Sequence, residues 1–334
     1  MAEIAFEYLA LALEDDRGVA EAAPTHYAML DGMLNPKQSR YRPSESRGTL
    51  AEFYRSQVVR KWTEWEGEAG LDNYILPVFC EMLVKGGVSP TTPAGATTTR
   101  LRTYTPSMTS DTLKTATMWW GDPNVQILQA PFCYISELMV SADASGEDGA
   151  TMSLKGMGQF AEKVSAPTLP SQLVSPLIAP ADMQLWIDTT TIGTTAITGR
   201  VISGEVTIPN TITPKYLAVG PGAARTYQRI GLGKRHATAK FTFELVDFDQ
   251  YDMWADADIL KVRWRLNGPA IEVVSGPATL YHYVEFDLYG PFDELEWGDY
   301  DGTNRTVTLS MQTEYNAGIG ADWSVKIQND RASL

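Results

Sequence analysis

The chain has 334 residues, of which 44% are hydrophobic and 20% are charged, and its formal net charge at pH 7 is −14. This length can build one large domain or two ordinary domains with substantial cores, and the composition excludes a largely disordered chain. The negative charge argues against a protein that binds duplex DNA by neutralising its phosphates, and against one that binds an anionic membrane surface.

The chain opens with an apolar segment, residues 4–13, which predicts a strand and leads into an exposed connection over residues 14–25. The first ten residues carry Glu3 and Glu7 but no basic residue, so we expect no signal peptide. No apolar run approaches the length of a membrane span, so we also expect no membrane partner.

Residues 36–48 contain prolines, serines and a glycine, and they predict an extended arm or a long loop. In an otherwise acidic chain this segment is locally basic, through Lys37, Arg40, Arg42 and Arg47. Two interpretations remain open: a solvated loop, or an arm that docks on an acidic surface of a neighbouring copy. Residues 50–66 predict a long strand with charges on both faces, which is typical of a projecting hairpin or an interface strand.

Residues 72–85 predict a helix. Their apolar side chains recur at helical spacing and form one stripe, so we expect an amphipathic helix that covers one side of a sheet. Asp72 or Asn73 can cap its start, and Gly86 with Gly87 can end it.

From residue 88 the chain is rich in Thr, Pro and Gly, and short strand patterns follow one another. Many short strands with such turns predict a β-sandwich or barrel. Residues 162–182 and 210–236 read as long connections, and residues 248–255 as one or two helical turns capped by Asp249. We expect strands at 98–104, 111–121, 132–143, 150–159, 184–190, 200–208 (ended by Pro209), 238–247, 257–267, 279–288, 305–314 and 322–328.

The segment 238–247 has the clearest alternation of the whole chain. A period of two places one set of side chains on the core face of a strand: Ala239, Phe241, Phe243 and Leu245. The other set faces water, and these residues are candidates for a functional surface: Thr238, Lys240, Thr242 and Glu244.

Metal and thiol chemistry find little support in the sequence. The two cysteines, Cys80 and Cys133, follow apolar residues, so buried free thiols in a reducing cytoplasm are favoured over a disulfide. The three histidines are scattered along the chain, and no metal-ligand spacing includes them. We expect no metal and no cofactor.

Enzymatic motifs are equally weak. The run Gly231-Leu-Gly-Lys234 lacks a glycine and a Ser or Thr that a phosphate-binding loop needs, and a turn before a strand is favoured. The acidic run at 247–258 lacks the central glycine and the closing glutamate of a calcium loop. Residues 299–304 could hold a calcium, but Asp-Gly between strands is first of all a turn. Glu294 and Glu296 could form a glycosidase pair, but two glutamates on an acidic loop are common. We expect no enzyme.

Taken in order, the motifs of the chain resemble those of the tail tube proteins (major tail proteins) of long-tailed, siphovirus-like bacteriophages. The resemblance covers nearly the whole chain and depends on the order of loosely specific pieces. These are Glu14-Asp-Asp-Arg-Gly18 with Pro24-Thr25, Ser39-Arg40 and Ser46-Arg47, Glu64-Trp-Glu-Gly67, the helix from Leu76-Pro77 to Gly86-Gly87, Cys133 to Ser141, Gly146-Glu-Asp-Gly149, Lys155-Gly-Met-Gly158, Val206-Thr-Ile-Pro-Asn210, residues 238–267, the turn at 301–302 and Val325-Lys-Ile-Gln-Asn329.

The resemblance implies a single tail-tube domain over residues 1–334, mainly β, of sandwich or barrel type, with a flanking helix. A long arm spans about residues 28–66, and loop excursions span about 162–182 and 210–236. Such subunits form rings, usually of six, that stack into a tube on a tape-measure protein, between a tail terminator and distal tail proteins. DNA leaves through the bore without specific binding, and the tube belongs to the virion after assembly in the host cytoplasm. Thr238, Lys240, Thr242 and Glu244 are then candidates for the bore wall, and the basic arm residues for contacts between copies.

Two alternatives remain open. One is a different virion part, such as a tail terminator or a decoration protein. The other is a carbohydrate-binding β-sandwich protein, which nine tryptophans and an acidic surface would suit.

Overall fold

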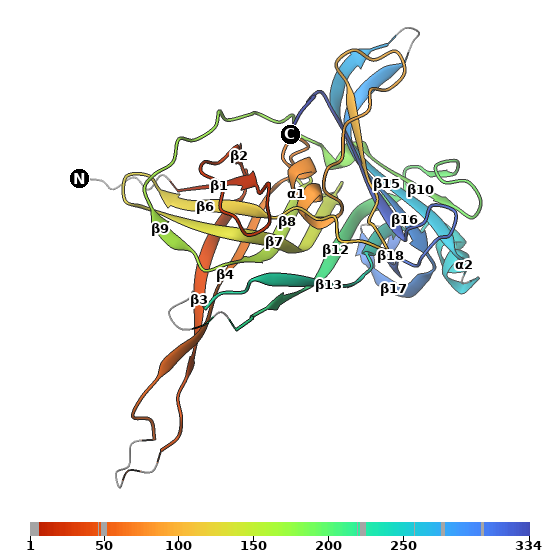
Figure 1. Cartoon of the computed structure of the whole chain (residues 1–334). Helices are drawn as coiled ribbons and strands as arrows, with labels where there is room; N and C mark the ends of the chain where they lie inside the picture. The colour runs from red at the N-terminus through yellow and green to blue at the C-terminus, as the bar shows by residue number, and fades with distance from the viewer. Residues whose placement is uncertain are drawn as a thin grey trace.

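The computed structural model describes residues 7–45, 47, 52–218, 220, 225–256, 258–274, 278–301 and 304–334, without the side chains of residues 300 and 301. Strands make up 54% of the described residues and helices 6%, which confirms the predicted mainly-β fold. Two antiparallel sheets with a flanking helix form a β-sandwich, and the described part contains no closed barrel (Figure 1).

The larger sheet contains an uninterrupted antiparallel series of eight strands. In spatial order these are β17 (Phe292–Asp301), β18 (Asn304–Gln312), β14 (Thr238–Glu244), β12 (Val201–Lys215), β7 (Gln126–Asp143), β8 (Thr151–Gly158), β4 (Gln57–Gly70) and β3 (Asp31–Tyr41). The first half of β7 pairs with β6 (Ala116–Asp122) and with β9 (Glu162–Val164). Strand β6 pairs in turn with β1 (Tyr8–Leu13), which pairs with β2 (His26–Tyr27). The second half of β12 pairs with β13 (Arg229–Arg235).

The second sheet packs against the larger one. Its order is β11 (Ala196–Ile197), β10 (Met183–Asp188), β15 (Leu260–Val273), β16 (Thr279–Gly290), β19 (Trp323–Asn329) and β5 (Arg100–Tyr104). Trp264 of β15 joins the two sheets, because its ring lies 6.1 Å from that of Phe241 on β14 and 5.7 Å from that of Phe286 on β16.

The predicted alternation on β14 is confirmed. Ala239, Phe241 and Phe243 are buried in the core shared by the two sheets, whereas Lys240 is exposed. The strand ends at Glu244, three residues earlier than the pattern suggested.

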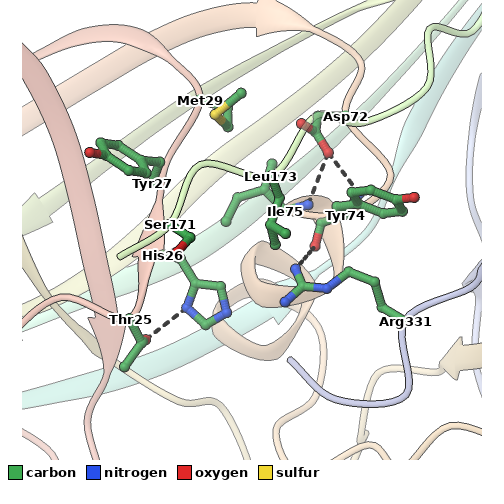
Figure 2. Close-up of a pocket in the computed structure, with 10 residues that line it drawn as sticks. All are labelled: Thr25, His26, Tyr27, Met29, Asp72, Tyr74, Ile75, Ser171, Leu173 and Arg331. Carbon is green, nitrogen blue, oxygen red and sulfur yellow. Dashed lines mark hydrogen bonds between the residues drawn. The ribbon is translucent and has the colours of Figure 1, made fainter. Parts of the chain in front are cut away.

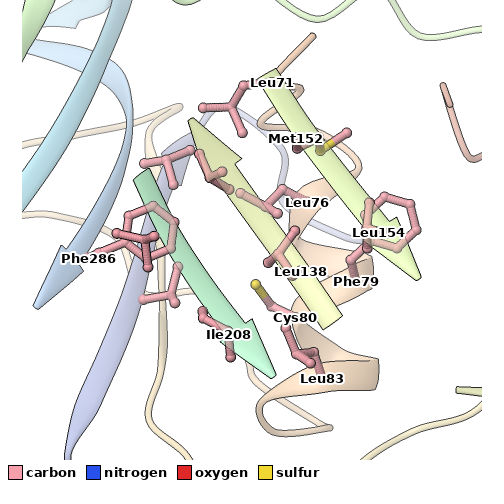
Figure 3. Close-up of a cluster of buried hydrophobic side chains, with 14 of the residues drawn as sticks. Leu71, Leu76, Phe79, Cys80, Leu83, Leu138, Met152, Leu154, Ile208 and Phe286 are labelled. Atoms are coloured by element: carbon pink, nitrogen blue, oxygen red, sulfur yellow. The ribbon is translucent and has the colours of Figure 1, made fainter. Parts of the chain in front are cut away.

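Helix α1 (Leu76–Leu83) lies where the sequence predicted a helix, but the expected amphipathic stripe is wrong. All eight of its residues are buried, including Glu81. Figure 3 shows its side chains against those of β7, β8 and β12. On the other side, the hydroxyl of Tyr104 donates to the carbonyl of Pro77, so the helix is enclosed.

The turns on both sides of α1 are held by carboxylates. Asp72 accepts hydrogen bonds from the backbone N–H groups of Tyr74 and Ile75, at 2.7 and 3.1 Å, and holds the turn before α1. The N-cap residue of the helix itself is Ile75, with no side-chain cap, so the predicted capping by Asp72 or Asn73 is wrong. Glu81 accepts from the backbone of Gly87 and Val88, which satisfies this buried side chain.

Pro209 does not end its strand, contrary to the prediction. It lies where β12 changes partner, between the pair Thr207–Thr238 with β14 and the pair Asn210–Arg235 with β13. Pro209 is the last residue paired with β7, opposite Glu137, and it lies in the gap between the ladders to β14 and β13, so proline is tolerated within the strand.

Two further expectations were wrong. Residues 231–234 belong to strand β13 instead of a turn, and the acidic segment with Glu294 and Glu296 is the edge strand β17 instead of a loop. The helical turns after β14 are present as α2 (Asp249–Ala255), but the carboxylate that accepts from its first N–H is Asp247 instead of Asp249. A short 3-10 helix, η1 (Pro180–Asp182), precedes β10.

Among the described residues, no helix is long and apolar enough to cross a membrane. Cys80 and Cys133 are buried free thiols, as predicted. Of the predicted segments, residues 4–6, 46, 48–51, 219, 221–224, 257 and 302–303 lie outside the described residues.

Candidate assembly surfaces

One face of the eight-strand series carries mostly polar side chains, with a few apolar ones such as Met139 and Met157 among them. Directly paired residues of antiparallel strands point to the same side of a sheet, so the register defines this face. One row runs from Thr151 (β8) through Ser141 (β7), Glu205 (β12) and Lys240 (β14) to Ser310 (β18) and Glu294 (β17). The residues of opposite parity form the core, as for Val140, Val206 and Phe241.

The four candidate residues of β14 lie at the centre of this polar face. Lys240 is exposed between its cross-strand neighbours Glu205 and Ser310. The hydroxyl of Thr242 shares a 3.1 Å hydrogen bond with that of Thr308, and Glu244 accepts from the side chain of Asn304 at 2.5 Å. Thr238 pairs with Thr207 and Gln312. The structure therefore brings all four into one surface with residues from other strands.

Carboxylates outnumber lysines on this face. Its acidic members by register are Asp31, Glu64, Glu66, Glu68, Glu137, Asp143, Glu205, Glu244, Glu294 and Glu296. Its basic members are Lys37, Arg60, Lys155 and Lys240, and Lys155 is paired with Glu137 at 2.7 Å. Sequence reasoning missed most of these carboxylates, because alternation within one strand does not say which other strands lie beside it.

The predicted basic arm is part of a β-hairpin, β3–β4, which projects far from the body of the molecule (Figure 1). Lys37 lies 3.8 Å from Glu64, and Arg40 donates to Ser56 at 3.5 Å. Arg47 pairs with Glu45 at 2.5 Å and its guanidinium lies 4.9 Å from the ring centre of Tyr54. Arg42 is exposed. The structure thus places all four on one projection, where part of their charge is balanced locally.

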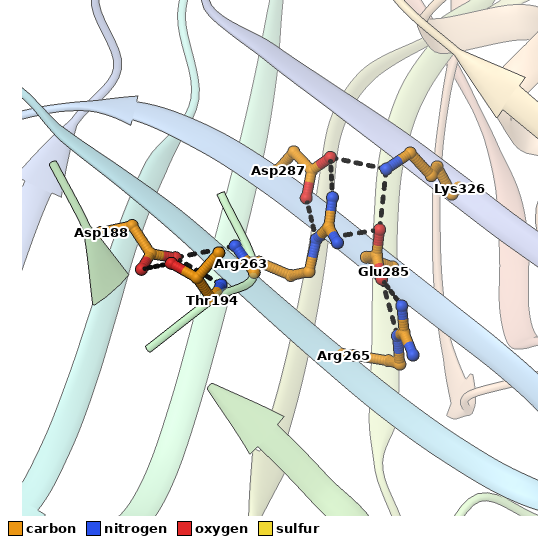
Figure 4. A network of polar contacts seen from close by, with 8 residues as sticks. Asp188, Thr194, Arg263, Arg265, Glu285, Asp287 and Lys326 are labelled. Carbon is orange, nitrogen blue, oxygen red and sulfur yellow. Dashed lines mark hydrogen bonds and ion pairs between the residues drawn. The ribbon is translucent and has the colours of Figure 1, made fainter. Parts of the chain in front are cut away.

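The outer face of the second sheet carries an ion-pair network that the sequence did not indicate (Figure 4). Glu285 and Asp287 of β16 are buried beneath Arg263, Arg265 and Lys326, with N–O distances of 2.7–2.8 Å for Arg263–Asp287 and for Lys326 to both carboxylates. Burial alone would raise the pKa of Asp287, but hydrogen bonds and charge from Arg263 and Lys326 hold it below its ordinary value. Both carboxylates are therefore engaged in ion pairs.

At the edge of the same sheet, Asp188 holds the loop between β10 and β11. It accepts from the backbone N–H groups of Gly193, Thr194 and Thr195, at 2.7–3.0 Å. Burial would raise the pKa of Asp188, yet the hydrogen bonds from Thr194 and Thr195 lower it to about 2.

One open hollow of the described residues lies on the polar face itself and is lined by residues that include Asp143, Glu205 and Lys240. The cavity in Figure 2, between β2, the start of α1 and Arg331, has a volume of ≈ 30 Å³, which is room for about one water molecule. Within the described residues, no three His, Cys, Asp or Glu side chains are grouped so that they could hold a metal ion. The acidic run around α2 is partly paired, since Arg200 lies 2.6 Å from Asp247.

Comparison with known proteins identifies one protein family. The model of a family described as phage tail tube protein matches residues 7–281. A search among curated proteins finds no match. The match includes the β3–β4 hairpin, α1 and all four candidate residues of β14.

Proposed function

Because the chain belongs to the phage tail tube proteins and is therefore a structural component of a virion tail, we propose that it polymerises as stacked rings of six copies into the tube through which DNA leaves the phage head. The tube grows along a tape-measure protein, between a tail terminator and distal tail proteins, and subunits assemble in the host cytoplasm. The role is mechanical, so it calls for no catalysis and no cofactor.

The observation that carries this proposal is the acidic polar face across eight strands. We assign it to the wall of the bore, with Thr238, Lys240, Thr242 and Glu244 near its middle. A wall with an excess of carboxylates repels phosphates, so DNA passes without being held. A basic wall would bind the polymer and slow its exit.

Ring formation also explains how the open edges of the larger sheet are covered. The described sheet is open, with β17 and β3 at its edges, and such edges are prone to uncontrolled pairing. Joining the sheets of neighbouring copies into one closed barrel removes the edges. The β3–β4 hairpin, with Lys37, Arg40, Arg42 and Arg47, then contacts an adjacent copy. One hydrophobic cluster includes residues of both sheets and of α1, which supports a single domain over residues 1–334.

Assembly is tested by sedimentation and negative-stain microscopy of the purified protein. We expect rings and tubes. Isolated rings that never stack would indicate another virion part, and a stable monomer that binds glycans would indicate the carbohydrate-binding alternative.

Replacing residues 40–59 by an Asn-Gly turn joins the paired residues Ser39 and Arg60, and should give a folded subunit that no longer forms tubes. Tubes of normal length from this variant would exclude a role for the hairpin.

The assignment of the bore wall is tested by thiol labelling in assembled tubes, because the two native cysteines are buried. We expect Thr242→Cys to react with a small maleimide but not with a maleimide carried on a particle too large for the bore. The matched control is Thr191→Cys, on an exposed loop of the second sheet, which should react with both reagents. Reaction of Thr242→Cys with the particle along the whole tube would refute the assignment.

A further inference from the structure

The end of the molecule opposite the β3–β4 hairpin is built from three segments that are joined to one another (Figure 1). They are residues 88–99, residues 171–178 and the outer part of the β15–β16 hairpin, residues 268–281, of which all but 275–277 are described. Hydrogen bonds connect the first to the third segment, through Glu272. The second is joined to the root of the hairpin through Ser175, Asn73 and His282. We call the described residues of these three segments the uncharged surface.

The uncharged surface departs from the rest of the chain in its composition. One residue in five of the chain is charged, but residues 88–99 and 171–178 contain no charged residue, and residues 268–281 contain only Glu272. The carboxylate of Glu272 accepts hydrogen bonds from the backbone of Thr97, Thr98 and Thr99, the shortest at 2.7 Å. Its charge is thereby spread over backbone dipoles that also fix residues 97–99 against the β15–β16 hairpin.

Aliphatic side chains stand out into solvent on this surface. Val174 is 88% exposed, Leu177 87% and Val273 72%. Leu173 and Tyr281 are also exposed, and Leu173 lines the small cavity in Figure 2 together with Met29. Depletion of charge together with protruding apolar groups is the composition of an interface core, and the hydrogen-bonded loops lower the entropy that binding would cost.

The occupant of this surface is a second copy of the chain. Identical copies that repeat along an axis meet through two different surfaces of the same molecule, one at each end. The β3–β4 hairpin supplies the opposite end, and it too exposes apolar side chains: Met33, Tyr41, Phe53 and Val59. Copies that each carry a net charge of −14 repel one another, and an uncharged surface facing a locally basic hairpin limits that repulsion.

We propose that the uncharged surface, centred on Val174 and Leu177, receives the β3–β4 hairpin of the next copy along the tube. This rests on the proposed tube function and names the surface that the hairpin meets. It also gives a role to the connection between β9 and β10, which contains residues 171–178.

The first test is the double variant Val174→Asp and Leu177→Asp in the full chain. Both side chains are exposed, so the subunit should keep its circular dichroism spectrum and its unfolding midpoint. The protein concentration needed for tube assembly should rise at least about tenfold, because two charges would be buried in the contact. The matched control is Val125→Asp, an equally exposed valine in the turn between β6 and β7, which should assemble as the wild type does.

The second test does not depend on a disruptive change. A photo-crosslinking residue at position 177 should capture residues 33–59 of another copy, as identified by mass spectrometry of tubes mixed from isotope-labelled and unlabelled subunits. If the wild type forms tubes and the double Asp variant assembles equally well, the inference is overturned but the proposed tube function stands. Crosslinks to other segments would overturn the choice of occupant. Failure of the wild type to form tubes would overturn the tube function itself, and this proposal with it.

Discussion

Replacing Phe241 by Ala tests how the two sheets are held together. The ring is fully buried and lies edge-on against Trp264, at 6.1 Å between ring centres. Large-to-small changes of a buried Phe cost about 3–5 kcal/mol, from lost transfer energy and the cavity that remains. The edge-on contact contributes about 0.5–1.5 kcal/mol beyond buried area, so we expect the upper part of this range. A typical domain is stable by about 5–15 kcal/mol, and the variant should therefore lose a large share of its stability.

The measurement is chemical denaturation at a concentration where sedimentation shows unassembled subunits. The matched control is Thr242→Ala, the next residue along β14, whose side chain lies on the polar face and makes one hydrogen bond to Thr308. It should cost about 1 kcal/mol or less. A loss below about 1 kcal/mol for Phe241→Ala, or equal losses for the two variants, would mean that the core does not lie on the assigned face of the sheet.

Two other predictions concern a buried carboxylate and a half-buried imidazole. The carboxylate of Glu14 is buried and accepts hydrogen bonds from Gly18, Thr115, Thr117 and Phe132, at 2.6–3.0 Å. Glu14→Gln would turn an N–H group toward these donors and should cost about 1–3 kcal/mol in chemical denaturation, whereas the exposed control Glu7→Gln should be neutral. Burial, with a smaller contribution from the charge of Arg331, lowers the pKa of His26 from 6.5 to about 4. The folded state then binds fewer protons than the unfolded state, so His26 contributes its full stability above pH 6.5 and loses it as the pH falls toward 4. Over this range the stability of the wild type relative to His26→Gln should fall by about 2–3 kcal/mol, and a constant difference would contradict the shift.

Local patterns in the sequence determined several features correctly. Alternation in residues 238–244 identified both the strand and its buried face, because successive side chains of a strand point to opposite sides. Helical spacing located α1, and the apolar context of Cys80 and Cys133 indicated buried thiols. Each of these depends on near neighbours in the chain.

Other features depend on contacts between segments that are far apart in the chain, and only the tertiary structure shows them. The helix α1 is buried all round because β7 packs on one side and Tyr104 on the other, and Pro209 is tolerated because β12 changes partners there. The acidic face arises only when Glu205, Lys240 and Glu294, from strands far apart in the chain, come into register. Register is set by long-range packing of the buried faces. The composition of residues 171–178 could be read from the sequence, but their place opposite the β3–β4 hairpin could not.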